Sequence, residues 1–203
     1  LIGPVLEVQP PSHLAPRLPR FPFDPFTHRM GGLRVGCVGA GMMAEAIAGG
    51  LDAAGVAKFA DMSASNRTQP RLDVFASWGV TPRASNSEVA QNCDVIFISV
   101  KPYTVAQVLE EMRPVLSKDT LVVSVAAGIT IATMEAAAGP GVPVVRVMPN
   151  TPCLVGCVAA GMAAGTHCEP RPTGTGSKLV NDIGKVPAVK ESLPNEVTGV
   201  SGR

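Results

Sequence analysis

Three small residues, Gly39, Gly41 and Ala44, stand at the spacing G-x-G-x-x-A directly after the apolar run from Leu33 to Val38. Where a strand turns into a helix, the first glycine of this motif permits the tight bend, and the second lets the main chain approach a diphosphate. A small third residue lets the helix pack closely on the strand, while amide groups at the helix N-terminus attract negative charge. Because a strand pattern precedes the motif and a helical pattern follows it, the sequence predicts a dinucleotide-binding turn. The motif comprises Gly39, Ala40, Gly41, Met42, Met43 and Ala44.

A second group of polar residues follows the next strand pattern, about 20 residues further on, where dinucleotide-binding proteins contact the adenosine ribose. The segment from Ser63 to Thr68 is rich in hydroxyl groups and contains Arg67. An arginine can form a planar, two-pronged contact with phosphate oxygens, so Ser65 and Arg67 favour the 2′-phosphate of NADPH over NADH. Two alternatives remain open: Asp61 reaches the ribose if the strand ends earlier, or Arg67 is a solvated loop cation.

Three further turns carry residues that suit a ligand site. Ligands bind to open α/β sheets at the carboxyl ends of the strands, so we expect these turns to face one crevice. Lys101 is either an acid or phosphate contact or a solvated surface charge, and Asn150 either orients a substrate or forms a turn. The candidate residues are Ser99, Val100, Lys101 and Pro102, then Ala126, Ala127 and Gly128, and finally Met148, Asn150 and Thr151.

These turns require a sheet whose strands are separated by helices. Met43, Ile47 and Leu51 fall at helical spacing after the glycine motif. Strands that are apolar on both faces and separated by helices are typical of a parallel sheet covered on two sides, so we predict an α/β protein with a Rossmann-type, doubly wound, mostly parallel sheet. The expected strands are Leu33 to Val38, Lys58 to Ala64, Val95 to Val100, Thr120 to Val125, Val142 to Val147 and Gly156 to Gly165. Further helices are expected near Arg71 to Trp78, Thr104 to Leu116, Ile131 to Ala138 and Gly176 to Gly184.

The first 30 residues differ from the rest of the chain. They hold seven of the 19 prolines and three of the six phenylalanines, without a helical or alternating period. This pattern predicts a leader without a packed fold over residues 1–30, followed by a dinucleotide-binding domain over residues 31–190. Arginines and few acids fit an organellar targeting peptide, whereas many prolines and little serine favour a cloning or gene-model extension. We expect a cytoplasmic protein, with a plastid or another organelle as the alternative if the leader is a targeting peptide.

The composition limits the class of function. The net charge is +1, charged residues make up 16% of the chain, and no apolar stretch reaches the roughly 18 residues of a membrane span. These properties disfavour a nucleic-acid partner and a membrane protein. Five cysteines without a C-x-x-C pair and only three histidines predict neither a disulfide framework nor a metal site, and Cys153 and Cys157 are interpreted as core thiols. We therefore expect a bound cofactor to supply the reactive atom.

Five segments in this order carry a specific resemblance: RVGCVGAGMMAEAIAGGL, SVKPYTVAQVL, LVVSVAAGIT, VVRVMPNTP and VTGVSG. From about Leu33 to Gly202 the sequence resembles pyrroline-5-carboxylate reductase. The resemblance implies reduction of 1-pyrroline-5-carboxylate to L-proline by hydride transfer from NADPH, or from NADH, to the ring imine. It also implies that residues 39–43 and Ser65 contact the dinucleotide, that Asn86, Lys101 and residues 126–128 border it, and that the MPNTP turn lies near nicotinamide and substrate. No catalytic residue is assigned.

The sequence also departs from this family. Members continue from VTGLSGSGPAY into a long helical region that dimerises and completes the substrate pocket, whereas this sequence ends at Arg203. We therefore expect residues 191–203 to be the start of a truncated C-terminal domain, and the homo-oligomer of the family to lack its dimerisation helices here. Exposed apolar area and coenzyme binding without turnover would follow. Two alternatives to the reductase are a non-catalytic dinucleotide-binding module and another Rossmann-type reductase, such as a hydroxyacid or coenzyme F420-type enzyme. The MPNTP and VTGVSG segments discriminate against the latter.

Overall fold

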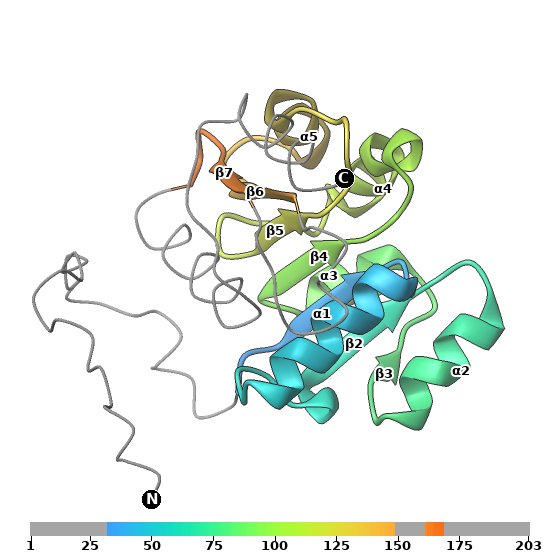
Figure 1. Cartoon of the computed structure of the whole chain (residues 1–203). Helices are drawn as coiled ribbons and strands as arrows, with labels where there is room; N and C mark the ends of the chain where they lie inside the picture. Colours follow the sequence, from blue (N-terminus) through green and yellow to red (C-terminus); the bar gives the residue numbers. More distant parts are fainter. Residues whose placement is uncertain (1–31, 149–160, 169–203) are drawn as a thin grey trace, which may run out of the picture.

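The computed structural model describes residues 32–148 and 161–168 of the chain, and these residues build one sheet with helices on both faces (Figure 1). The strand order is β3-β2-β1-β4-β5-β6-β7; β1 to β6 run parallel, and β7 runs antiparallel to β6. This arrangement confirms the predicted doubly wound, mostly parallel sheet. The strands are β1 (Val35–Val38), β2 (Met62–Ser65), β3 (Thr81–Pro82), β4 (Val95–Ile98), β5 (Leu121–Ser124), β6 (Val144–Met148) and β7 (Gly161–Ala164).

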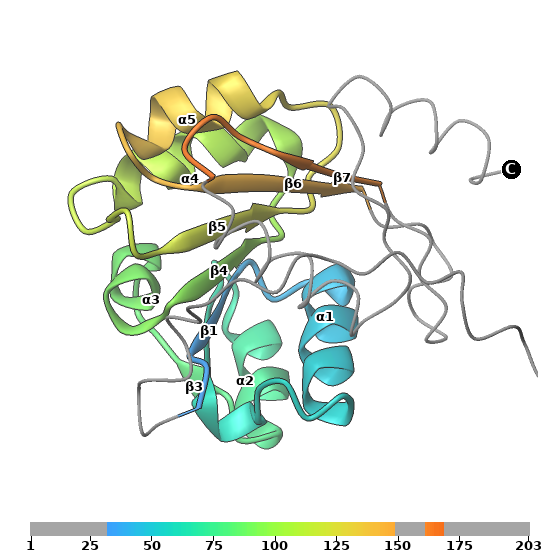
Figure 2. The same cartoon turned by 90° about the vertical axis from the view of Figure 1, so that its left-hand side faces the viewer.

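Apolar residues fill both sides of the sheet. The residues of β1, β4 and β5 are buried throughout, as expected for strands covered on two faces. On one face Ile47 and Leu51 of α1 and Phe75 of α2 pack against the strands, and on the other face residues of α3, α4 and α5 do so (Figure 2). The helices are α1 (Met42–Ala53), α2 (Gln69–Ser77), α3 (Asn86–Asn92), α4 (Val105–Met112) and α5 (Ile131–Ala138), with 3₁₀ turns η1 (Phe59–Asp61) and η2 (Pro102–Thr104).

The structure corrects several predicted boundaries. The second strand starts at Met62 rather than at Lys58, because residues 59–61 form η1. The fourth helix covers Val105–Met112 instead of the longer predicted segment, because η2 precedes it. The two-residue strand β3 and the short polar helix α3 were not predicted. The strand β7 lies within the predicted strand at 156–165, of which residues 156–160 fall outside the described residues. The 1–30 leader, the predicted helix at 176–184 and residues 191–203 lie outside the described residues.

The strand order places the two halves of the sheet on opposite sides of β1. From β1 the chain moves outward to β2 and β3, then returns to pair β4 with the other edge of β1 and continues to β5 and β6. The direction of winding therefore reverses between β1 and β4. In open α/β sheets, ligands bind at the carboxyl ends of the strands at this point, where the helices on either side leave a crevice.

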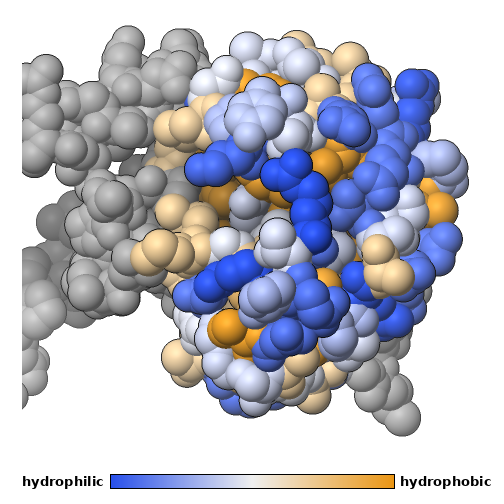
Figure 3. Space-filling model, turned by 90° about the vertical axis from the view of Figure 1, so that its right-hand side faces the viewer, coloured by the Kyte–Doolittle hydropathy of each residue, from blue (hydrophilic) through white to orange (hydrophobic). Residues whose placement is uncertain are grey.

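Large apolar side chains are exposed at three described positions, Met42, Trp78 and Tyr103. On the face drawn in Figure 3, hydrophilic residues lie interspersed with small apolar areas. Met42 starts α1, directly after the turn that follows β1, and Tyr103 lies in η2, after β4. Two of the three exposed apolar side chains thus belong to segments that follow the two strands at the reversal point.

Candidate functional site

The turn between β1 and α1 lies at the reversal point of the sheet. Gly39 has a φ of +92°, and its N–H donates to the carbonyl oxygen of Ser65 at 2.9 Å. A Cβ at Gly39 would lie 2.9 Å from the carbonyl oxygen of Ser99 and 3.0 Å from Val100. The main chain of Gly39 thus contacts the ends of both neighbouring strands, β2 and β4, and only glycine fits there.

At Gly41, unlike at Gly39, the backbone conformation does not require a glycine. Its φ of −84° is open to any residue, and a Cβ there would meet no atom of the described residues within 4 Å. Gly41 is the N-cap of α1, and no side chain among the described residues caps this helix through a hydrogen bond. The first turn of α1 therefore offers main-chain N–H groups beside open space, which is the arrangement that a phosphate group requires.

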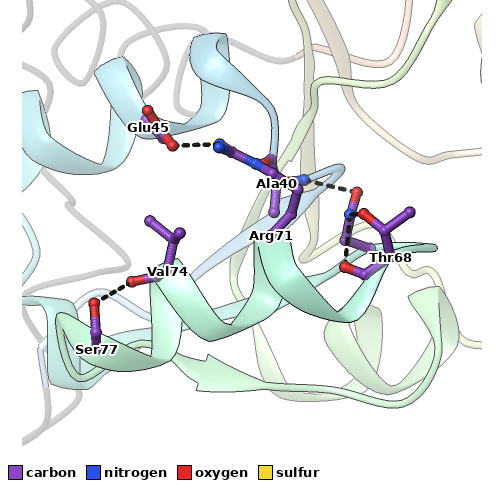
Figure 4. A network of polar contacts seen from close by, with 7 residues as sticks. Ala40, Glu45, Thr68, Arg71, Val74 and Ser77 are labelled. Atoms are coloured by element: carbon purple, nitrogen blue, oxygen red, sulfur yellow. Dashed lines mark hydrogen bonds and ion pairs between the residues drawn. The ribbon is translucent and has the colours of Figure 1, made fainter.

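Two side chains hold Ala40, the residue between the two glycines (Figure 4). The Ala40 N–H donates to Oδ1 of Asn66 at 3.2 Å, and the Ala40 carbonyl oxygen accepts from Nε of Arg71 at 2.6 Å. Nη2 of Arg71 also forms an ion pair with Glu45 in the first turn of α1. Neither Asn66 nor Arg71 was among the predicted site residues, because their contacts join positions 26 and 31 residues from Ala40.

The segment after β2 carries the predicted adenosine-side residues. Ser65 ends β2 and is buried, and its hydroxyl group donates to Oδ1 of Asn86 at 2.7 Å. The amide nitrogen of Asn86 donates in turn to Glu111 at 2.9 Å, so Asn86 joins the end of β2 to α4. Arg67 is exposed in the loop before α2. Asp61 lies in η1, before β2, at the amino end of the strand, which removes the alternative that its carboxylate reaches the ribose.

The turn after β4 adjoins the glycine turn. The Ser99 N–H donates to the carbonyl oxygen of Val38 at 2.9 Å, while the buried Ser99 hydroxyl oxygen has no hydrogen-bond partner among the described residues. Lys101 and Pro102 are exposed, and the Lys101 carbonyl oxygen accepts from the Thr104 hydroxyl group at 2.8 Å. Of the predicted residues 99–102, Ser99 and Val100 therefore lie beside Gly39, and Lys101 and Pro102 follow in the same turn.

The turn after β5 and the last residue of β6 lie at the same edge. Ala126 is buried, whereas Ala127 and Gly128 are exposed, and Gly128 has a φ of +73°. Met148 ends β6 in a buried position, with its sulfur 3.5 Å from Nη2 of Arg146. The remaining predicted substrate-proximal residues, Asn150 and Thr151, lie outside the described residues, as do Cys153 and Cys157.

The described cysteines are free thiols away from this edge. Burial raises the pKa of Cys37 to about 12 and that of Cys93 to about 11, and burial also raises the pKa of Cys168. These thiols are therefore protonated near neutral pH and are poor nucleophiles. Among the described residues, histidine, cysteine and acidic side chains form no group that could hold a metal ion. The part of the chain that the structure describes also has no helix that is long and apolar enough to cross a membrane.

The sequence and the fold of this chain are similar to those of known oxidoreductases. Residues 34–128 match the family model described as NADP oxidoreductase, coenzyme F420-dependent. The chain is 41% identical over 169 residues to pyrroline-5-carboxylate reductase 3 of Mus musculus, which covers 83% of this chain and 62% of the mouse protein. The chain is thus similar in sequence to a pyrroline-5-carboxylate reductase over most of its own length.

Two solved structures of reductases extend the likeness to the fold. The pyrroline-5-carboxylate reductase of Coxiella burnetii has a TM-score of 0.79 and 31% identity, and the match covers 85% of this chain and 64% of that one. The Plasmodium falciparum pyrroline carboxylate reductase, solved with NADP bound, has a TM-score of 0.75 and 28% identity over the same shares. This chain therefore spans slightly less than two thirds of the length of these reductases.

Proposed function

We propose that this chain binds NADPH at the turn between β1 and α1, and that the protein reduces 1-pyrroline-5-carboxylate to L-proline. The observation that carries the coenzyme proposal is the uncapped N-terminus of α1 beside Gly41, at the point where the sheet reverses its winding. The substrate is proposed from the kinship with pyrroline-5-carboxylate reductases. The bound NADP of the Plasmodium falciparum relative supports the choice of coenzyme.

The proposed coenzyme contacts line the carboxyl edge of the sheet. Residues 39–43 take the diphosphate, and Ser65 and Arg67 take the adenosine ribose and its 2′-phosphate. Asn86, residues 99–102 and residues 126–128 border the rest of the coenzyme. Met148, Asn150 and Thr151 are the residues that we propose lie near the substrate. Arg67 is suited to its part because an exposed guanidinium can turn its planar fork toward phosphate oxygens.

The proposed reaction asks little of acidic or basic side chains. When bound, the coenzyme supplies the hydride, and the carbon of the ring imine accepts this hydride once the imine nitrogen is protonated, which yields the saturated ring of proline. The protein then contributes by holding the two partners in line and by keeping water away. These limited roles of the protein agree with the composition of the carboxyl edge of the sheet, which offers main-chain and hydroxyl groups such as those of Gly41 and Ser99.

The proposal extends to the organisation of the protein. We propose that residues 31–190 form the coenzyme-binding domain, that the protein assembles with copies of itself, and that it works in the cytoplasm. The free thiols Cys37, Cys93 and Cys168 support a reducing compartment, where thiols are kept from oxidation.

Two measurements on the purified chain test the proposal. The first compares the dissociation constants of NADPH and NADH for the wild type and for Arg67→Gln. We expect the substitution to weaken NADPH by about tenfold, as loss of one charge-assisted hydrogen bond does, and to leave NADH unchanged. Equal weakening of both coenzymes would contradict the role of Arg67.

The second measurement follows NADPH oxidation with and without 1-pyrroline-5-carboxylate and quantifies the proline formed. Oxidation that depends on the substrate and yields one proline per NADPH supports the full proposal. Binding of NADPH without proline formation supports the coenzyme site and means that these residues alone do not carry the proposed reduction. A folded chain that binds neither coenzyme contradicts both parts.

A further inference from the structure

Arg71 connects α2 to the glycine turn although it lies outside the motif. It is the third residue of α2, partly buried, and it reaches across to α1 (Figure 4). Its Nε donates to the Ala40 carbonyl oxygen at 2.6 Å, and its Nη2 pairs with the carboxylate of Glu45. The planar guanidinium forms the two contacts with two different nitrogens, whose relative positions are fixed by the fork.

The peptide groups of Ala40 are therefore held from both sides by one neighbouring segment. Asn66 accepts a hydrogen bond from the Ala40 N–H, and its own amide nitrogen donates to the hydroxyl group of Thr68 at 2.9 Å. Asn66, Thr68 and Arg71 all belong to the loop after β2 or to the start of α2. The residue between the two glycines is thus fixed by the segment that carries Arg67.

The turn needs such support from outside. Glycine has more accessible backbone conformations than any other residue, so Gly39 and Gly41 alone do not select the conformation in which the N–H groups converge. The ion pair of Arg71 and Glu45 is only partly buried, so water screens it and the pair by itself contributes little to the stability of the turn. The bond to the Ala40 carbonyl oxygen instead acts on the main chain that borders the open space at Gly41.

We propose that Arg71 is a positioning residue for coenzyme binding: it holds the 39–41 turn in its diphosphate-binding conformation without touching the coenzyme. The inference rests on the coenzyme site proposed above. Both nitrogens of Arg71 that form contacts are directed at Ala40 and Glu45, whereas Arg67 is exposed in the loop. Arg71 therefore acts on the diphosphate, which NADPH and NADH share, and Arg67 acts on the 2′-phosphate, which only NADPH carries.

The test compares Arg71→Met with Arg67→Gln by titration with NADPH, NADH and adenosine 2′-monophosphate. We expect Arg71→Met to weaken NADPH and NADH by the same factor, about tenfold, and to leave adenosine 2′-monophosphate unchanged, because that ligand lacks the diphosphate. Arg67→Gln is expected to weaken NADPH and adenosine 2′-monophosphate and to spare NADH. Arg71→Lys, which keeps the positive charge and one donor nitrogen, is expected to recover part of the lost affinity.

Several outcomes overturn the inference. Unchanged affinity of Arg71→Met for both coenzymes means that Arg71 does not support the turn. Loss of NADPH affinity alone means that Arg71 contacts the 2′-phosphate directly. If Arg71→Met fails to fold, as judged by circular dichroism, Arg71→Lys decides by the same comparison. If the wild-type chain binds neither coenzyme, both the proposed function and the inference are contradicted. If the wild type binds the coenzymes and the Arg71→Met and Arg71→Lys variants bind them equally well, only the inference is contradicted.

Discussion

At the amino edge of the sheet, side chains join β1 to β4, whereas at the carboxyl edge the main chain of Gly39 abuts Ser99 so closely that a side chain would collide. Just before the two strands, Nε and Nη2 of Arg34 bind the carboxylate of Asp94 at 3.1 and 2.7 Å. After the strands, a Cβ at Gly39 would lie 2.9 Å from the Ser99 carbonyl oxygen. At the amino edge the contact between β1 and β4 is thus made by side chains, whereas at the carboxyl edge it is made by the main chain. Stability and coenzyme binding should therefore respond separately to substitutions at the two edges.

The largest effect is expected for Gly39→Ala. The φ of +92° and the contact with Ser99 make any side chain costly, by about 1–3 kcal/mol of backbone strain. Because relief of this strain must move the turn, we expect NADPH affinity to fall by about 100-fold, equivalent to about 3 kcal/mol. Thermal unfolding and calorimetric titration measure the two losses. Retention of full affinity would mean that the turn does not hold the coenzyme.

Gly41→Ala sharpens the comparison because it should change binding alone. Its φ of −84° suits alanine and its surroundings are open, so we expect an unchanged melting temperature. The added methyl group would occupy the space that we assign to the diphosphate, and we expect NADPH affinity to fall by about tenfold or more. Gly49→Ala is the matched control: Gly49 lies within α1 and is also open, so stability should rise by up to about 1 kcal/mol with no loss of affinity. Equal affinities of the two variants would contradict the assignment.

Asp94→Asn tests the opposite edge. The substitution removes the charge that pairs with Arg34, a partly exposed residue, and we expect the free energy of unfolding to fall by about 1 kcal/mol. The affinity for NADPH should not change, because the pair lies at the other end of both strands. Chemical denaturation and coenzyme titration of the same preparation provide the measurement. A loss of affinity in the folded variant would show that the two edges are coupled.

The smallest effect concerns Cys37, in the middle of β1 between the two edges. Burial raises the pKa of this thiol from 9.0 to about 12, so the folded state favours the protonated form. The contribution of this thiol to the free energy of unfolding is complete well below pH 9 and is lost as the pH rises through the folded pKa; about 0.4 kcal/mol is already lost at pH 9. Denaturation between pH 7 and 9 should show a flatter pH dependence for Cys37→Ala than for the wild type. Identical slopes would show that Cys37 does not contribute.

Local patterns were sufficient where the signal lies within one element. The helix Ile131–Ala138 has the predicted bounds, because its cap residue Thr130 and its buried Ile131 and Met134 all lie close together in the sequence. The strands β4 and β5 are short, largely apolar runs, and the glycine motif directly predicts the turn that contains it. By contrast, α3 buries only Val89 and Ala90, so its sequence lacks the amphipathic signal of a helix.

The remaining features depend on contacts that no local pattern encodes. The expected strand at Lys58 starts later because η1 intervenes, and this shift decides that Asp61 lies at the wrong end of β2 for the ribose. The support of Ala40 by Asn66 and Arg71 joins separate elements, so residue types near the motif cannot reveal it. Sequence thus identifies the glycines of the turn more readily than the side chains that hold the turn in place.

Calorimetric titration of the folded chain with NADPH and NADH, repeated on Gly41→Ala, tests the central claim most directly. The main-chain amides after β1 should bind one coenzyme molecule per chain, NADPH should bind more tightly than NADH, and the alanine should weaken both coenzymes. A folded wild-type chain that binds neither coenzyme, or a Gly41→Ala variant that binds both as the wild type does, would contradict it.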